Sequence, residues 1–329
     1  MDGVHIRSGG YITPSKIFQE SLFAERGIDW ITRAHVREVE PGAANIETLD
    51  GDQRAVPFDM AMLLPPFTGV GLKAFNAGGE DISSTLFAPN GFMKVDADYT
   101  KKPYEDWKPR DWPRTYQSPA YKNLFAAGIA FAPPHAISRP RATASGQVIA
   151  PAPPRTGMPS AMIAKAVAHS IRDMVQGKPE PTHTASMAEM GAACVASAGA
   201  NPFTGTAASI TVFPIVPDYE RYPEYGRDID YTFGEIGLAG HWIRSFSTGD
   251  VSLQSPPVPR LGNDPGVAMS QEQKNLTPVE KAHLKPWFYA TKPTRGTVFL
   301  RTFLPWQMRR FVRINLKMFT IIGRSHHSH

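Results

Sequence analysis

The chain has 329 residues, of which 42% are apolar, so it is long enough for about two domains and apolar enough to bury hydrophobic cores. This composition excludes a fully disordered protein, and the single cysteine, Cys194, excludes a disulfide framework or a metal site built from several cysteines of this chain. The formal net charge is +5, but the last 49 residues contain ten of the 35 Lys and Arg residues and no Asp or Glu. A basic tail of this kind is typical of a segment that faces a membrane or a nucleic acid.

The first 64 residues predict a helix followed by strands. Residues 14–26 have apolar side chains at helical spacing and precede Gly27, which predicts a helix with a C-terminal glycine. Residues 28–40 alternate and are rich in β-branched side chains, which predicts a strand. Two glycine-containing turns follow, so we expect residues 45–49 to pair back and residues 58–64 to form a fully apolar strand. This order is typical of the second half of a dinucleotide-binding unit, whose first strand and glycine turn would precede this chain.

The middle of the chain predicts long loops around two regular elements. Residues 65–118 are loop-rich, with a short strand expected near residues 92–95. Residues 123–130, NLFAAGIA, predict a buried strand because they are apolar and are soon followed by prolines. Thr156 or Ser160 then suits the cap of a helix whose apolar residues recur on one face.

The segment from residue 181 to residue 296 predicts less regular structure. Residues 181–250 are a mixed segment that contains Cys194, and residues 251–296 predict a linker in which Pro278 opens a short helix. Cys194 lies in the small-residue run GAACVASAGA. A small core residue is the favoured interpretation over a thiolate nucleophile, because the sequence names no partner base.

Two further patterns carry little functional weight. Residues 69–74 fit the dinucleotide pattern G-x-G-x-x-G/A, but Pro65 and Pro66 separate them from the preceding strand, so coincidence is favoured. The ten histidines show no ligand spacing, and the three at the carboxyl end are interpreted as a terminal tract. We therefore expect no metal site.

The carboxyl-terminal segment carries the strongest physical signal. Pro305 suits the first turn of a helix, and residues 304–324 predict about six turns. At 100° per residue from Leu304, the apolar residues fall within about 80° and the basic residues between about 140° and 240°. The apolar residues are Met308, Phe311, Val312, Met318, Phe319 and Ile322, and the basic residues are Arg309, Arg310, Arg313, Lys317 and Arg324.

A helix with opposed apolar and basic arcs suits an anionic membrane interface, where each basic residue contributes about 1 kcal/mol. The alternative is a helix docked on the body or on a partner subunit, with its basic face in water. Nucleic acid is disfavoured because the bulky apolar residues would then face water. No uncharged apolar run reaches ~18 residues, so attachment would be peripheral. The residues expected at the membrane are Trp306, Arg309, Arg310, Phe311, Arg313, Lys317 and Phe319.

Several of these segments together resemble a known family. NLFAAGIAFAPP, a proline-rich loop and RTGMPSAMIAKAVAHSI resemble the carboxyl-terminal half of the sulfide:quinone oxidoreductase family, which are FAD-containing flavoproteins of the membrane surface. RGIDWITRAHVREVEPG, MAEMGAACVASAG and FGEIGLAGHWI resemble further parts of it, so that the resemblance spans about residues 11–324. It implies an α/β fold made of an incomplete pair of Rossmann-like FAD/NAD(P)-type domains, with a carboxyl-terminal amphipathic helix at the membrane surface.

The resemblance also implies site residues. Gly128 and Ile129 stand at the strand end that approaches the flavin, and the helix aimed at the isoalloxazine ring opens with Arg155, Thr156, Gly157 and Met158. A helix N-terminus there would stabilise the negative charge of reduced flavin. Pro66 and Phe67 lie in the loop assigned to quinone, and Cys194 is the candidate redox thiol.

The implied domain order follows the same resemblance. It assigns residues 1–115 to the second half of the NAD(P)-type domain with a loop insertion, 116–180 to the returning part of the FAD domain, 181–250 to a capping or substrate segment, 251–296 to a linker, 297–324 to the membrane-binding helix and 325–329 to a disordered tail.

The implied activity is that of a membrane-associated FAD-dependent oxidoreductase on the cytoplasmic face, which passes electrons from sulfide or another reductant to quinone. Three departures bear on it: the opening FAD module is absent, Ile129 replaces an acid, and Ser186 stands near the usual downstream cysteine. Alternatives are a non-catalytic membrane-bound subunit, a half-protein that pairs with a separate flavin-binding chain, a homo-oligomer and an NAD(P)H:quinone reductase.

Overall fold

The protein is described from a computed structural model, which defines residues 4–8, 11–150, 152–154, 156–198, 203, 205–247 and 294–326. The predicted helix at Pro278 and most of the predicted linker lie outside the described residues, as does Arg155. The side chains of Ile129 and of a few residues at element ends are also outside the description.

The chain divides into two compact units, each built from segments that are far apart in the sequence. Unit 1 comprises Met1–Ile31, Ala193–Thr211 and Ile229–Phe319, and unit 2 comprises Thr32–Ala192, Val212–Asp228 and Thr320–His329. The six consecutive segments expected from the sequence stay a prediction. Taken together, helices and sheets make the chain a mixed α/β protein.

Unit 1 is built on a five-stranded sheet of order β2-β1-β10-β9-β8. β1 is parallel to β10, whereas β2 is antiparallel to β1 and β9 is antiparallel to β10. The helix predicted over residues 14–26 is confirmed as α1, and it packs Phe18 against Ile6 and Ile236 of the sheet. The strands are β1 (His5–Ser8), β2 (Tyr11–Pro14), β8 (Ala192–Ala198), β9 (Thr206–Val212) and β10 (Phe233–Gly237), and α1 spans Ser15–Glu25.

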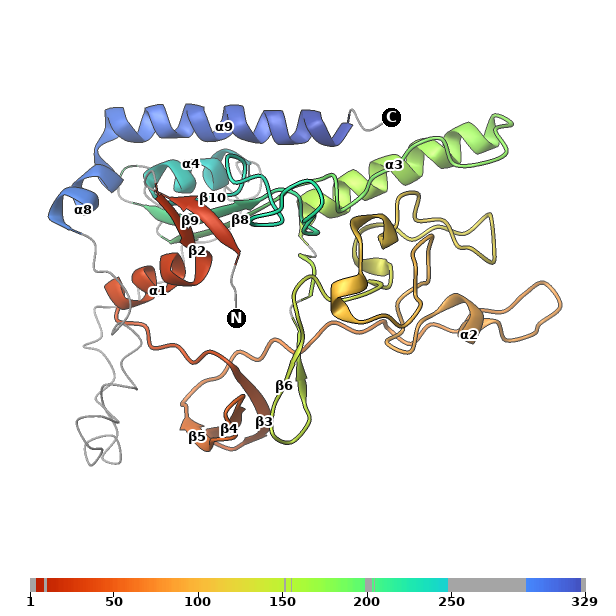
Figure 1. Cartoon of the computed structure of the whole chain (residues 1–329), viewed down its shortest axis with the longest axis horizontal. Coiled ribbons are helices and arrows are strands. Elements are labelled where there is room, and N and C mark those ends of the chain that lie inside the picture. Colours follow the sequence, from red (N-terminus) through yellow and green to blue (C-terminus); the bar gives the residue numbers. More distant parts are fainter. Residues whose placement is uncertain are drawn as a thin grey trace, which may run out of the picture. The chain divides into compact units, whose positions relative to one another are not determined.

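Three further helices follow, and the long last one lies along α4 (Figure 1) and passes from unit 1 into unit 2 at Thr320. They are α4 (Leu238–Ser247), α8 (Arg295–Thr302) and α9 (Leu304–His326), the last of which confirms the helix predicted over residues 304–324. Ile314 of α9 is buried with Phe233 and Ala239. No helix among the described residues is both long and apolar enough to cross a bilayer.

Unit 2 contains a three-stranded antiparallel sheet, a small hairpin, and a long helix packed on loops. The sheet is β3 (Ala34–Glu40), β4 (Ala43–Thr48) and β5 (Gln53–Pro57), and the hairpin is β6 (Arg141–Ala142) with β7 (Val148–Ile149). The helical elements are α2 (Ser83–Leu86), η1 (Tyr104–Asp106), η2 (Pro109–Asp111), η3 (Gly128–Ala130) and α3 (Gly157–Val175). The hairpin is tied to the sheet by Glu47, which is 1% exposed and accepts hydrogen bonds from the backbone and hydroxyl of Ser145.

Four expectations about strands are wrong in whole or in part. The strand expected over residues 28–40 begins only at Ala34. Residues 58–64 form no strand, and residues 92–95 and 123–130 form only isolated bridges or a 3-10 turn. A strand needs a neighbour for its backbone groups, and apolar composition alone cannot supply one.

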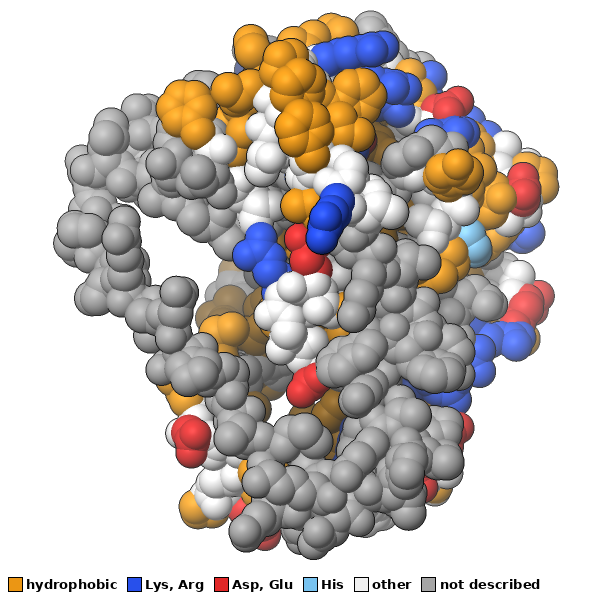
Figure 2. All heavy atoms as spheres, turned by 90° about the vertical axis from the view of Figure 1, so that its left-hand side faces the viewer, with side chains coloured by type: hydrophobic (Ala, Val, Ile, Leu, Met, Phe, Trp, Pro, Cys, Tyr) orange, Lys and Arg blue, Asp and Glu red, His pale blue; other side chains and the backbone are white. Residues whose placement is uncertain are grey.

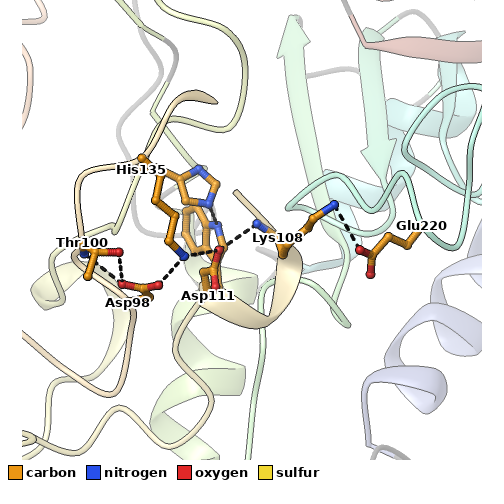
Figure 3. A network of polar contacts seen from close by, with 8 residues as sticks. Asp98, Thr100, Lys108, Asp111, His135 and Glu220 are labelled. Carbon is orange, nitrogen blue, oxygen red and sulfur yellow. Dashed lines mark hydrogen bonds and ion pairs between the residues drawn. The ribbon is translucent and has the colours of Figure 1, made fainter. Parts of the chain in front are cut away.

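The loops of unit 2 are instead held by a polar and aromatic network (Figure 3). Lys102 bridges the carboxylates of Asp98 and Asp111, and Asp111 also accepts a 2.8 Å hydrogen bond from the backbone N–H of Lys108. Trp112 Nε1 donates a 2.6 Å hydrogen bond to His135 Nε2. Side chains thus replace strand pairing as the source of order in this proline-rich region.

Candidate functional site

The N-terminus of α3 forms the first wall of the candidate site. Thr156 occupies the N-cap position, as predicted, but its side chain makes no capping hydrogen bond. Its Oγ1 atom is buried and has no hydrogen-bond partner among the described residues. The first turn of α3 contains no acidic residue, so the N–H groups and the positive end of the helix dipole are available to a negatively charged group.

The turn at Gly128 forms the second wall. Gly128 has φ +62°, a left-handed conformation that favours glycine, and it starts the turn η3. A Cβ atom at this position would lie 3.2 Å from Cβ and 3.3 Å from Oγ of Ser160 in α3. Glycine is therefore needed both for the backbone conformation and for the close approach of η3 to α3.

A pocket lies where these two walls meet. Its cavity volume is about 10 Å³, room for roughly one water molecule, within a hollow of about 220 Å³ that includes space open to solvent. Its lining is mostly apolar, consisting of Gly128, Phe131, Pro153, Pro154, Pro159, Ser160, Ile163 and Met187. The structure therefore brings together Gly128 and the start of α3, which the sequence placed 28 residues apart.

Most of the lining residues were not singled out from the sequence. Ser160 was noticed only as a possible helix cap, and Phe131 and Met187 carried no signal beyond being apolar. Ser186, next to Met187, is buried, and its hydroxyl accepts a hydrogen bond from the N–H of Ala188. The useful signal was the proline content of this region, because Pro153, Pro154 and Pro159 all line the pocket.

The residues present fit one end of a flavin. A buried hydroxyl without a partner, a helix N-terminus free of acidic groups and a close-packed glycine turn suit a flat ring that becomes negatively charged when it is reduced. Gly157 is exposed and Met158 is half-buried at the same end of α3. Arg155, which was expected to add a positive charge, lies outside the described residues.

Residues 69–74 have a packing role. A Cβ atom on Gly69 would lie 2.0 Å from the carbonyl oxygen of Gly91, and the N–H of Gly69 donates a 2.7 Å hydrogen bond to Asn90 O. Glycine at this position lets two loops cross in backbone contact. The dinucleotide-like spacing is thus accounted for without a nucleotide, in line with the favoured interpretation from the sequence.

Cys194 lies in a different compact unit from this pocket. It is an exposed residue of β8. Desolvation by the surrounding chain raises the pKa of the Cys194 thiol, so less of it is thiolate at neutral pH than in an ordinary cysteine. Its role as a redox thiol stays a prediction. Among the described residues, no group of three or more His, Cys, Asp or Glu side chains is placed to hold a metal ion.

The two residues expected to contact quinone lie in a surface loop. Pro66 and Phe67 are exposed, with 67% of Phe67 accessible. Neither residue lines the pocket at α3. A contact between these two residues and quinone would therefore form on the protein surface and not inside the pocket at α3.

Helix α9 divides its residues between a docked face and an outer face. Gln307, Ile314 and Ile321 are buried. The docked face includes residues expected at the membrane: Phe311 packs edge-on against Trp242 at 5.9 Å, and Arg310 pairs with Glu235. The apolar arc expected from the sequence is therefore split. Phe311 and Met318 lie on the docked face, whereas Met308, Val312 and Phe319 are exposed.

The outer face of α8 and α9 is apolar, and exposed arginines, among them Arg309 and Arg313, lie beside it. Figure 2 shows hydrophobic side chains gathered over this part of the molecule, next to basic ones. Arg309 and Arg313 border the apolar side chains of α9 and are exposed. The exposed apolar residues are Val298, Phe299, Leu300, Phe303, Leu304, Met308, Val312, Leu316 and Phe319, which are 39–69% accessible and which we call the helical apolar face.

Comparison with known proteins gives one sequence relative and one related structure. No family model matches the sequence. The chain is 30% identical over 279 residues to a sulfide-quinone reductase of Aquifex aeolicus (strain VF5), and the match covers 85% of this chain and 52% of the relative. A solved sulfide:quinone oxidoreductase from the same hyperthermophilic bacterium gives a TM-score of 0.46 at 24% identity, over 72% of this chain and 44% of that one. The chain thus spans about half the length of the curated relative it matches.

Proposed function

Since the chain belongs to the sulfide:quinone oxidoreductase family, we propose that it forms the carboxyl-terminal part of a membrane-associated, FAD-dependent enzyme that passes electrons from sulfide or another reductant to quinone. The observation that carries this proposal is the pocket between Gly128 and the N-terminus of α3. The sequence relative supports the class of reaction, and the pocket supports the start of α3 as the place where the flavin end of the cofactor would approach.

In this proposal Thr156, Gly157 and Met158 contact the flavin end of FAD, and Gly128 allows its close approach. FAD, when bound, supplies the two-electron redox chemistry. The free Thr156 hydroxyl offers a hydrogen bond, and the α3 N–H groups stabilise negative charge at the ring edge. The apolar lining excludes water from that edge. Binding of the adenine and pyrophosphate is assigned to residues that this chain does not provide.

The helical apolar face is proposed to lie in an anionic membrane interface. Its side chains are large and contiguous along α8 and α9, and each contributes about 1.5–3 kcal/mol when it is fully buried. Arg309 and Arg313 stand at its edge, where they would meet lipid phosphates. Quinone dissolves in the bilayer, so an enzyme held on its surface receives this substrate directly, with Pro66 and Phe67 as the proposed contact.

The reductant is the least supported part of the proposal. Cys194 remains the proposed redox thiol because it is the single cysteine in the sequence. Its raised pKa opposes that role unless a basic group approaches it.

The proposal is tested by flavin titration of the full chain. We expect FAD and lumiflavin to bind weakly, with dissociation constants above about 10 µM, because the pocket at α3 offers contacts to the ring end alone. Thr156→Val should weaken lumiflavin binding about tenfold through loss of one hydrogen bond. Ser84→Val, an exposed position in α2, is the matched control and should change nothing.

Two outcomes would contradict the proposal. Flavin retained at one equivalent by the chain alone would show that no further module is needed for FAD. Equal lumiflavin affinity in the wild type, Thr156→Val and a folded Gly128→Val variant would remove the α3 pocket as the flavin site.

A second candidate function is a non-catalytic membrane-bound subunit that pairs with a separate flavin-binding chain. It is favoured by the exposed apolar residues near position 64, which have no cover within their own unit. Absence of a flavin effect in the titration, together with retained vesicle binding, would select it.

A further inference from the structure

A second exposed apolar surface lies in unit 2, in an extended segment. Residues 60–72, which we call the apolar segment, run from the end of the β5 region towards α2 without forming a helix or strand. Only Pro65, Pro66, Thr68 and the glycines interrupt its apolar side chains. The large ones are Met60, Met62, Leu63, Leu64, Phe67, Val70 and Leu72, which are 53–87% accessible.

The first part of this segment also has no backbone partner among the described residues. Phe58 N–H donates a 2.9 Å hydrogen bond to Gly42 O, and Gly69 N–H donates a 2.7 Å hydrogen bond to Asn90 O. Between them, residues 59–68 make no hydrogen bond to any residue that the structure describes. These residues are exposed, so their backbone N–H and C=O groups are open to water and available to pair with an added strand.

The side chains indicate that both faces of the segment need cover. Successive side chains of an extended chain point to opposite sides. Leu63 and Leu64 are neighbours, and both are exposed, at 53% and 82%. A run that is apolar on both sides is typical of an interior strand in a parallel sheet, which is covered on both faces.

Lipid is a poor occupant of this surface. An irregular segment in the hydrocarbon region would leave N–H and C=O groups unsatisfied, at several kcal/mol each. The segment also contains no basic residue, since Lys73 lies just beyond it and Asp59 just before it. Attraction to anionic headgroups is therefore absent.

A second copy of the chain also fits poorly. Two copies related by a two-fold axis would pair the segments antiparallel, and Pro65 and Pro66 have no N–H to donate to such a ladder. Pairing confined to residues 60–64 would still leave one face exposed. The remaining occupant is a strand of a different polypeptide region that already carries layers on both faces.

We propose that residues 60–64 add as a strand to the edge of another protein module, one that presents an unpaired and largely apolar strand with helices on both sides. Pro65 ends the added strand. The chain matches only 52% of its relative's length, so the relative contains further protein that this chain does not match. Naming that further part as the flavin-binding module rests on the proposed function, whereas the strand addition itself does not.

Site-specific photo-cross-linking of the full chain in its own cells tests this proposal. p-Benzoylphenylalanine replaces Met62, which is 80% exposed, or Tyr219, which is 58% exposed in the same unit and serves as the control. The adduct is identified at the peptide level by mass spectrometry. We expect one other polypeptide to be joined at Met62 and not at Tyr219, through a peptide with the apolar pattern of a strand.

Two further measurements on the co-purified complex complete the test. The amides of residues 60–64 should become at least about tenfold slower in hydrogen exchange than in the chain alone. Leu64→Lys should lower recovery of the complex at least about tenfold, and Tyr219→Lys should leave it unchanged.

Cross-linking to a second copy of the same chain, to lipid, or to nothing above the control would each overturn the strand addition. The flavin absorbance of the complex reports separately on the proposed function. A complex that protects residues 60–64 but carries no flavin would contradict the proposed function and support the strand addition.

Discussion

The helical apolar face and the apolar segment expose similar side chains, yet they need different surroundings. Phe319 in the helix is 69% exposed and Phe67 in the segment is 67% exposed. The backbone of α9 is satisfied by its own i→i−4 hydrogen bonds, whereas residues 59–68 have no backbone partner among the described residues. The exposed apolar area alone therefore does not show whether a surface contacts lipid or another protein.

The backbone makes the distinction, because a bilayer accepts only segments whose polar groups are already paired. Arginines at the edge of the helical apolar face add a charge pattern that fits anionic lipid, and the apolar segment has no such residues. We therefore assign the first surface to lipid and residues 60–64 of the second to protein, which leaves Pro66 and Phe67 to the proposed quinone contact. Each prediction below acts on one surface and leaves the other unchanged.

Hydrogen exchange should separate the two surfaces by the largest factor. In the chain alone, the amides of α9 from Met308 to Phe319 should exchange at least about 1,000-fold more slowly than those of residues 59–64, because only the helix has intramolecular partners. Peptide-resolved mass spectrometry measures both at once. Strong protection of residues 59–64 in the chain alone would show that the segment is already covered.

Charge placed on the helical apolar face should abolish vesicle binding. Met308→Glu with Phe319→Glu removes two exposed apolar anchors and puts acids against anionic lipid, so flotation on phosphatidylglycerol vesicles should fall more than about 100-fold. Ser84→Glu with Thr85→Glu makes the same change in charge at exposed positions of α2 and should float normally. Normal flotation of the α9 variant would refute the assignment to lipid.

Removing the two edge arginines should weaken binding without abolishing it. Arg309→Ala with Arg313→Ala should cost about 2 kcal/mol, or roughly 30-fold, on anionic vesicles, and almost nothing on neutral vesicles. Raising the salt concentration should reduce the difference. The matched variant with lysine at both positions should bind nearly as well as wild type, and a loss as large as that of the alanine variant would point to a specific guanidinium contact.

The sequence predicted three helices because their signals are local, and it missed α2 and α4. The periodicity that predicted α1, α3 and α9 is complete within each segment, and so is the N-cap position of Thr156. Strands failed where their partners are distant or missing, as in residues 58–64 and 123–130. The docked face of α9 could not be predicted either, because it depends on the shape of the surface against which the helix packs.

The candidate site was predictable only in part. Gly128 and the start of α3 followed from the family resemblance, and the structure places them together. Ser160 and Met187 complete the pocket, but side chains brought in from elsewhere in the chain leave no local pattern. Cys194 lies in the other compact unit, a separation that consecutive sequence boundaries do not represent.

Acid should have the smallest effect, lowering the stability of unit 2 while leaving vesicle binding by α9 unchanged. Burial lowers the pKa of His135, which is held neutral with Nε2 accepting from Trp112 (Figure 3). The unfolded chain binds this proton near pH 6.5, and the folded chain binds it only at lower pH, so the free energy of unfolding should fall as pH drops below about 6.5. Arginines keep their charge over this range, so vesicle binding by α9 should persist while the stability of unit 2 declines.

Urea unfolding of the full chain between pH 5 and 8 measures this effect. Within that window the carboxylate of Asp98, whose pKa is lowered by its hydrogen bond from Lys102, stays ionised in both states and contributes no slope. His135→Gln keeps an acceptor for Trp112 without a titrating group, so it should flatten the dependence on pH. It should not remove it, because desolvation also lowers the pKa of His241 in unit 1. An unchanged slope in His135→Gln would mean that His135 does not titrate with unfolding and would contradict this prediction.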